Sequence, residues 1–330
     1  MNTTYSFRSL LAEDIKRYLD FKRATGRKFN TEEAALRLFD RFLLEYPIMD
    51  LDALTPQLIE VFLASRLRTR PRSFNHLLGV IRCFFAWSVA QGRLTYSPVR
   101  SQLRADNSRR FPYIFKPEQV QHILIIAAQL PDNSRATHRA EVYTLIFRLM
   151  YALGLRVGEI VRLCHADVDR TRRLLIIRQT KFGKNRLVPI GPKLWEHIEA
   201  YLTSRAKWHT QWQSDDPLFS FSNGLRKPIR SETISQTFHH LLPKIEITCN
   251  EGTNPPCLHC LRHSFAVQTL LRWYRSGIHP SQKLLHLSTF MGHSDPTSTS
   301  WYLTITDDLL AEANRRFERL AGSVLKEVGI

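Results

Sequence analysis

Residues 257–266 read CLHCLRHSFA and place two cysteines, two histidines and one arginine within seven positions. Cys257 and Cys260 have the Cys-x-x-Cys spacing of many zinc sites, an interpretation that makes both cysteines and both histidines ligands. His259 and Arg262 are three residues apart, so on a helix they share one face, where together they suit a phosphate group. The spacing within the stretch fits both interpretations, and the rest of the chain has to decide between them.

Length and composition bound the class of protein. A chain of 330 residues is long enough for two domains, because single cores stop growing near about 250–300 residues. Hydrophobic residues make up 43%, but no apolar run approaches the roughly 20 residues that span a bilayer. The first residues lack a basic start followed by an apolar block, so we expect a cytoplasmic protein without a membrane partner. Five cysteines, an odd number, favour reduced thiols over a disulfide framework.

The charge balance points to a polyanionic partner. The chain has 47 Lys and Arg against 30 Asp and Glu, a net charge of +17, and its pI is about 10.0. Both halves of the sequence carry a positive excess, whereas a basic tail on a neutral enzyme would place the excess at one end. We therefore expect a nucleic acid as the partner, held by both halves of the chain.

Residues 1–100 are predicted to form a helical bundle. Apolar residues recur at helical spacing over 9–26, 30–46, 55–67 and 73–92, with short connections between these segments. Thr55 followed by Pro56 is typical of a helix N-terminus.

Residues 101–116 lose this periodicity and are predicted to be a linker. The segment either crosses a phosphate backbone or is an exposed connector with solvated charges.

Residues 117–330 are predicted to form a second, α+β domain that ends in a long helix. Two apolar segments, 173–180 and 186–190, flank the turn-like sequence KFGKN and predict a β-hairpin. Another short apolar run, PLFSF at 217–221, is a candidate strand, and the remaining segments have helical spacing. The expected fold class is mainly α, with one small antiparallel sheet.

Residues of four separated segments in this second domain stand out chemically. They are Arg156, the hairpin-tip Lys181 or Lys184, His259 with Arg262, and His293 followed nine residues later by Tyr302. In order and content these segments resemble the tyrosine recombinase family, also called the phage integrase family. Its pattern is Arg, Lys, His-x-x-Arg, then Gly-His and a tyrosine. The resemblance is specific from Arg156 to Tyr302, whereas before the linker it rests on the helical architecture alone.

The resemblance implies an activity and a division of labour between the domains. Residues 1–100 correspond to a core-binding domain and residues 117–330 to a catalytic domain. The stretch STSWYLTIT at 298–306, with the long amphipathic helix expected after it, resembles integrases of mobile elements. The implied enzyme is a nucleoid-associated, site-specific recombinase that acts as a homotetramer on two sites of double-stranded DNA. Other recombinases of the same element are further candidate partners. A type IB topoisomerase and a non-catalytic DNA-binding protein on the same fold are the alternatives.

The chemistry of the residues agrees with that activity. Cleaving a DNA phosphodiester builds negative charge on the phosphate oxygens, so fixed cationic donors aimed at them speed the reaction. The planar forks of Arg156 and Arg262 suit this role, and His293 adds another hydrogen bond. Tyr302 is the predicted nucleophile, with His259 relaying its proton. Lys181, with Lys184 as the alternative, would protonate the leaving 5′ oxygen. Neither a metal nor another cofactor is expected.

Several interpretations of single residues follow. We expect no zinc at 257–260, because no second ligand pair matches it elsewhere in the sequence. Both cysteines are then small buried side chains, and His263 is predicted to pack within its helix rather than to support Arg262. The terminal helix docks either on its own domain or on a neighbouring protomer. Candidate DNA contacts are the arginines before the fourth predicted helix and in the linker: Arg66, Arg68, Arg70, Arg72, Arg109 and Arg110.

Overall fold

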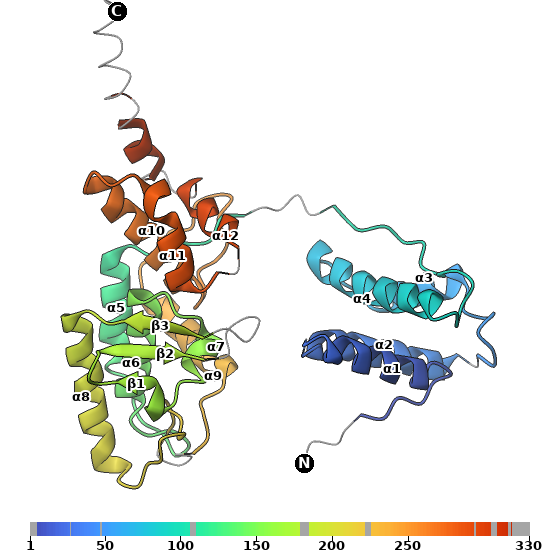
Figure 1. Ribbon diagram of the computed structural model, residues 1–330, viewed down its shortest axis with the longest axis horizontal. Helices are drawn as coiled ribbons and strands as arrows, with labels where there is room; N and C mark the ends of the chain where they lie inside the picture. Colours follow the sequence, from blue (N-terminus) through green and yellow to red (C-terminus); the bar gives the residue numbers. More distant parts are fainter. Residues whose placement is uncertain are drawn as a thin grey trace, which may run out of the picture. The chain divides into compact units, whose positions relative to one another are not determined.

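The computed structural model describes residues 5–26, 28–46, 48–105, 110–178, 185–221, 226–293, 295–304, 309–315 and 318. The chain forms two compact units, Met1–Arg109 and Arg110–Ile330 (Figure 1). The boundary between them falls inside the segment 101–116. Within the described ranges, no helix has the length and apolar character needed to cross a membrane. The roles predicted for the two units remain predictions.

The first unit contains the predicted helices. They are α1 (Ala12–Ala24), α2 (Asn30–Glu45), α3 (Pro56–Ser65) and α4 (Pro71–Ala90). Helix α3 begins as expected: the Thr55 hydroxyl accepts a hydrogen bond from the backbone N–H of Leu58 at 3.3 Å, with Pro56 in the first turn. Helix α4 begins at Pro71, two residues before the predicted segment, because proline suits the first helical position.

Aromatic side chains form the core of the first unit. The ring of Phe39 packs edge-on against Phe62 at 4.9 Å and against Phe85 at 5.8 Å between centroids. Phe84 and Phe85 on α4 have no exposed surface, so they belong to the core and cannot stack on a nucleic acid. The unit therefore has its own hydrophobic core.

The second unit is mostly helical and contains one small sheet. Its elements are α5 (Pro117–Ala127), α6 (Arg139–Ala152), α7 (Val157–Ile160), η1 (His165–Asp167), β1 (Val168–Asp169), β2 (Leu174–Ile177), β3 (Arg186–Pro189), α8 (Pro192–Trp208), α9 (Ser231–Leu241), η4 (Leu242–Lys244), α10 (Cys260–Arg275), α11 (Pro280–Met291), α12 (Thr297–Ser300) and η5 (Trp301–Thr304). The fold class predicted from the sequence is confirmed.

The sheet has the order β1-β2-β3 and is antiparallel throughout. Strands β2 and β3 form the predicted hairpin, with Leu175 opposite Val188 and Ile177 opposite Arg186. The strand predicted at 217–221 is wrong: Pro217 makes an isolated bridge with Cys164, and residues 218–221 are irregular. Its apolar side chains Leu218 and Phe219 are buried in the core instead, and burial alone produces an apolar run without any strand.

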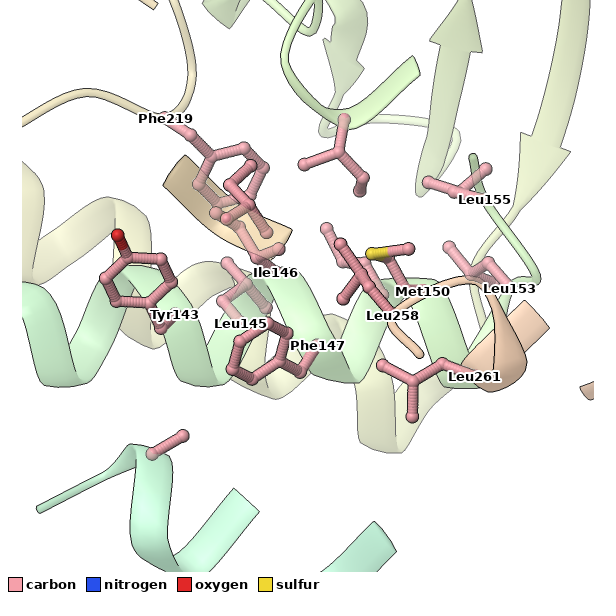
Figure 2. Packing of buried hydrophobic residues seen from close by; sticks show 14 of the residues in the cluster. Tyr143, Leu145, Ile146, Phe147, Met150, Leu153, Leu155, Phe219, Leu258 and Leu261 are labelled. Atoms are coloured by element: carbon pink, nitrogen blue, oxygen red, sulfur yellow. The ribbon is translucent and has the colours of Figure 1, made fainter. Parts of the chain in front are cut away.

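Helix α6 lies at the centre of the second unit. Figure 2 shows its side chains Tyr143, Ile146 and Met150 among residues of the surrounding segments, Leu258 and Phe219 included. Helices α5 and α8 lie against α6 (Figure 1). Buried residues of β2 and β3 belong to the same core. Helices α7 and α10 also contact α6, so α6 fixes both of them in the same unit.

Candidate active site

Arg262 is a buried cation on the first turn of α10. Its side chain is about 1% exposed, and its two terminal nitrogens donate hydrogen bonds to the carbonyl oxygens of Gly154 and, at 2.8 Å, Met291. Burial, with the nearby charge of Arg156, lowers its pKa to about 9, so the guanidinium still carries its charge at neutral pH. Arg262 therefore joins the segment before α7 to the end of α11.

Gly154 permits this arrangement. Its φ is +60°, and a Cβ there would lie 2.4 Å from the ring of Phe265, so any side chain would push α10 away.

Arg156 lies on the neighbouring turn and points to the same carboxyl end of α11. Its Nη2 donates to the carbonyl oxygen of Gly292 at 2.9 Å, next to the Met291 carbonyl used by Arg262. Its Nη1 and its backbone N–H both donate to Glu159 at 2.9 Å. About 31% of the Arg156 side chain remains exposed, so this guanidinium keeps a face open to a ligand.

Arg186 is a member of this cluster that the sequence analysis missed. It lies at the start of β3, and its terminal nitrogens donate to both carboxylate oxygens of Glu159 at 2.8 and 2.9 Å, while Nε donates to the carbonyl oxygen of Phe290 at 2.9 Å. Glu159 therefore bridges Arg156 and Arg186. Gly292, with φ +67°, lies so close to Arg186 that a Cβ would be 2.7 Å from its Nη1.

The carboxylate of Glu159 is buried and held ionised. Burial raises its pKa, but the hydrogen bonds and charge of Arg186, together with Arg156, lower it to about 2. The folded-state pKa lies below the ordinary value of 4.5, so the resulting stability is present above pH 4.5 and is lost as the pH falls through about 2. The difference corresponds to about 3 kcal/mol at neutral pH.

We expect Glu159→Gln to lower the free energy of unfolding by about 3 kcal/mol at pH 7, and this deficit to shrink by about 1 kcal/mol at pH 4. Urea unfolding of both chains at the two pH values measures it. The matched control is Glu199→Gln, which breaks a surface pair with Arg170 and should cost at most about 1 kcal/mol. Equal losses in the two variants, with no pH dependence, would contradict the assignment.

Tyr302 and His263 form a direct contact. The hydroxyl of Tyr302 lies 2.8 Å from Nδ1 of His263, and the tyrosine is about 3% exposed. Burial raises the pKa of Tyr302, although the charges of Arg262 and Arg156 act to lower it. His263 was predicted to pack within its helix; the structure instead makes it the hydrogen-bond partner of the tyrosine. The signal available in the sequence was its place next to Arg262.

His293 and His259 complete the cluster. The His293 ring is stacked with Tyr302 at 6.4 Å between centroids, and its Nδ1 lies 2.6 Å from the hydroxyl of Thr299. The His259 ring lies edge-on to that of His263 at 4.7 Å. Burial, with the nearby cations, lowers the pKa of His259 and His293 to about 4, and burial, with His259 and Arg262, lowers that of His263 to about 3. All three rings are therefore neutral at physiological pH, and each has one ring nitrogen that carries no proton.

The structure thus brings together five of the predicted catalytic residues: Arg156, His259, Arg262, His293 and Tyr302. The sixth, Lys181, lies outside the described residues, as does the alternative Lys184. Strands β2 and β3, which flank that segment, end and begin on the side of the sheet where Arg186 contacts Glu159. The roles of the six remain predictions.

The described residues contain no group of three or more His, Cys, Asp and Glu side chains arranged to hold a metal ion. Cys257 and Cys260 lie close together, with their Sγ atoms 3.4 Å apart. His259, the third ligand in the zinc interpretation, belongs to the cluster around Arg262.

The first unit carries a separate basic surface between α3 and α4. A cavity of about 370 Å³ is lined there by Arg66, Leu67, Arg68, Thr69, Arg70 and Ser73. Arg68 donates to the Ser73 hydroxyl at 2.7 Å, and its carbonyl oxygen accepts from Arg104 at 2.8 Å, so the segment is held in place. Arg70 and Arg72 are exposed, as is Arg110 in the second unit, while Arg109 lies outside the described residues.

Comparisons with known proteins place this geometry in context. The model of the phage integrase family matches residues 114–308. The Sinorhizobium fredii protein y4rB, named as an integrase/recombinase, is 33% identical over 94% of this chain and 98% of its own length. The Tn1549 transposon integrase, solved with transposon right end DNA, has a TM-score of 0.63 at 18% identity and covers 94% of this chain and 98% of its own. A lambda integrase tetramer bound to a Holliday junction has a TM-score of 0.60 at 18% identity, covering 87% and 78%.

Proposed function

The chain belongs to the phage integrase family of tyrosine recombinases, and we propose that it cuts and rejoins DNA at specific sites through a 3′-phosphotyrosine on Tyr302. The integrase/recombinase name of its Sinorhizobium fredii relative and the transposon integrase with the same fold favour an enzyme of a mobile element. The reaction needs neither metal nor ATP, because one phosphodiester is exchanged for another.

The observation that carries the proposal is the tethering of two guanidinium groups to consecutive carbonyls, Met291 and Gly292, beside Tyr302. Such anchored forks lose little freedom when they bind a phosphate, and they stabilise the charge that builds up on its oxygens. The partly exposed guanidinium of Arg156 would meet the phosphate at the surface, while the buried Arg262 supplies a fixed positive charge beneath it.

The phenol proton has a defined acceptor. Tyr302 is protonated in the resting enzyme, because burial raises its pKa, so attack on phosphorus requires a base. Nδ1 of the neutral His263 already lies 2.8 Å from the hydroxyl, and the ring of His259 contacts that of His263. We assign the first proton transfer to His263 and retain His259 as the relay beyond it.

Cleavage exchanges one bond to phosphorus for another. The Tyr302 oxygen forms a bond to phosphorus, the bond from phosphorus to the 5′ oxygen breaks, and that oxygen leaves with a proton supplied by Lys181. Attack by a 5′ hydroxyl of a partner strand reverses these changes and releases the tyrosine. Repeating the exchange on both strands gives recombination.

We further propose that both units contact the phosphate backbone and that four copies act together on two sites. The net charge of +17 and the arginines at the start of α4 support the contact by the first unit. The tetrameric state is carried over from the lambda integrase tetramer on a Holliday junction.

The direct test incubates the protein with nicked suicide substrates made from the DNA that flanks its gene. We expect a covalent protein–DNA adduct on a denaturing gel, with and without EDTA. An absence of adduct on every flanking sequence would leave only a DNA-binding protein, and a requirement for a divalent ion would contradict the scheme. Holliday-junction products with paired sites separate recombination from relaxation by a type IB topoisomerase.

DNA affinity should fall steeply with salt, because each neutralised phosphate releases a counterion. We expect Arg70→Gln to reduce the slope of log K against log salt by about 1. Arg172→Gln is the matched control: Arg172 pairs with Asp169 in the turn before β2, at the opposite end of that strand from the predicted lysine tip. Fluorescence anisotropy over a salt series measures both. An unchanged slope in Arg70→Gln would remove this residue from the interface.

A further inference from the structure

Cys257 and Cys260 form a dithiol that the proposed strand-exchange chemistry does not use. Their Sγ atoms are 3.4 Å apart, and the backbone N–H of Cys260 donates to the carbonyl oxygen of Cys257 at 2.9 Å. This turn holds the two residues within the Cα separation that a disulfide accepts. Forming a bond of about 2.05 Å requires the sulfur atoms to approach by only about 1.4 Å.

The two thiols differ in accessibility and in acidity. Cys257 is partly exposed before the helix, whereas Cys260 is about 2% exposed at the first position of α10. The pKa of Cys257 is lowered, first by the hydrogen bond from Cys260 and further by the backbone N–H groups of Cys260 and His259, although burial opposes this. The pKa of Cys260 is raised, by its bond to Cys257 and by burial. The pair thus consists of an accessible, acidic thiol and a buried partner.

We propose that Cys257 and Cys260 are a thiol–disulfide exchange site that accepts low-molecular-weight disulfides of the glutathione type and closes an intrachain disulfide around His259. The Cys257 thiolate attacks one sulfur of the small disulfide, forming a mixed disulfide and releasing one thiolate. The Cys260 thiol then loses its proton and attacks the Cys257 sulfur, releasing the second. Two protein thiols are oxidised by two electrons, the small disulfide is reduced to two thiols, and the two protein protons end on them.

The disulfide would close a ring of residues 257–260, and this ring lies next to the candidate active site. It encloses Leu258, which is buried beside Met150 (Figure 2), and His259, whose ring contacts His263. Leu258 holds the turn from the core side, so drawing the sulfur atoms together moves the His259 backbone. We expect the oxidised chain to form severalfold less DNA adduct than the reduced chain; this expectation rests on the proposed function.

The first experiment reads the thiols alone. Full-length protein is treated with oxidised glutathione, alkylated and digested with trypsin, and the peptide 245–262 is weighed. That peptide also contains the exposed Cys249, so the reference chain carries Cys249→Ser. We expect its peptide to carry no alkyl group and to weigh two hydrogen atoms less than the unalkylated dithiol, and to take up two alkyl groups when dithiothreitol precedes alkylation. A reference peptide that remains fully alkylated, while the exposed Cys83 reacts, would overturn the proposal.

Single substitutions in the same background test the order of attack. In Cys260→Ser the mixed disulfide cannot be resolved, so a glutathione adduct should accumulate on Cys257. In Cys257→Ser the remaining thiol, the buried Cys260, should hardly react with oxidised glutathione. Equal modification of the two variants would contradict the asymmetry, and thermal unfolding curves verify that both remain folded.

A final arm compares adduct formation by oxidised and reduced chains on the suicide substrate. A severalfold loss on oxidation that is absent from Cys257→Ser supports the link to His259, and an unchanged yield would break it. If the reduced chain forms no adduct at all, the proposed function fails while the thiol result stands.

Discussion

Tyr302→Phe is expected to abolish the covalent adduct while leaving DNA affinity within about twofold of the unchanged chain. The substitution removes only the hydroxyl, whose partner is His263, and keeps the ring that stacks with His293. None of the proposed phosphate contacts is lost, since we assign the anion to Arg156 and Arg262. Denaturing gels measure the adduct and fluorescence anisotropy the affinity.

The matched control for this experiment is Tyr143→Phe. Tyr143 is another buried tyrosine of the second unit, on α6, and the side chains that act on its hydroxyl are those of Thr237 and Arg139, which do not belong to the arginine cluster. The Tyr143→Phe variant should form the covalent adduct to the same extent as the unchanged chain. Adduct formation that persists in Tyr302→Phe would move the nucleophile to another residue.

Arg262→Lys is expected to lower the single-turnover cleavage rate by about 10²–10³-fold. Lysine keeps a positive charge but cannot donate to the Gly154 and Met291 carbonyls and to a phosphate with one planar fork. The rate at saturating protein separates this loss from weaker binding, and the thermal unfolding midpoint reports any loss of stability.

Arg205→Lys controls for the burial of an arginine. Arg205 is also about 1% exposed, and it donates to the carbonyl oxygen of Pro217 at 2.9 Å and to the Ser220 hydroxyl at 2.8 Å. Arg205 is on α8 and these partners are in the irregular segment 217–221, which contributes no residue to the candidate active site, so this variant should lose stability but cleave at the normal rate per folded molecule. If both variants lost cleavage in proportion to stability alone, Arg262 would have a structural role only.

The helices of the first unit and the β-hairpin of the second could be predicted because their signals are local. Apolar spacing, the Thr55–Pro56 start of α3 and the turn between two apolar segments all act over a few residues. The strand expected at 217–221 failed for the same reason: an apolar run records that Leu218 and Phe219 are buried but not against what. The candidate site was predictable as a set of residues through the resemblance to a known family.

The sequence by itself determined the residue types of the site and the order in which they occur. Only the tertiary structure decided their partners. Arg186 meets Glu159 across 27 residues, Arg156 meets Gly292 across 136, and His263 meets Tyr302 across 39. These pairings depend on how α7 and α10 pack on α6, and on how α11 packs on α10 and β3. Local periodicity reports which face of a segment is buried, whereas the partner across the core is set by the packing of the whole unit.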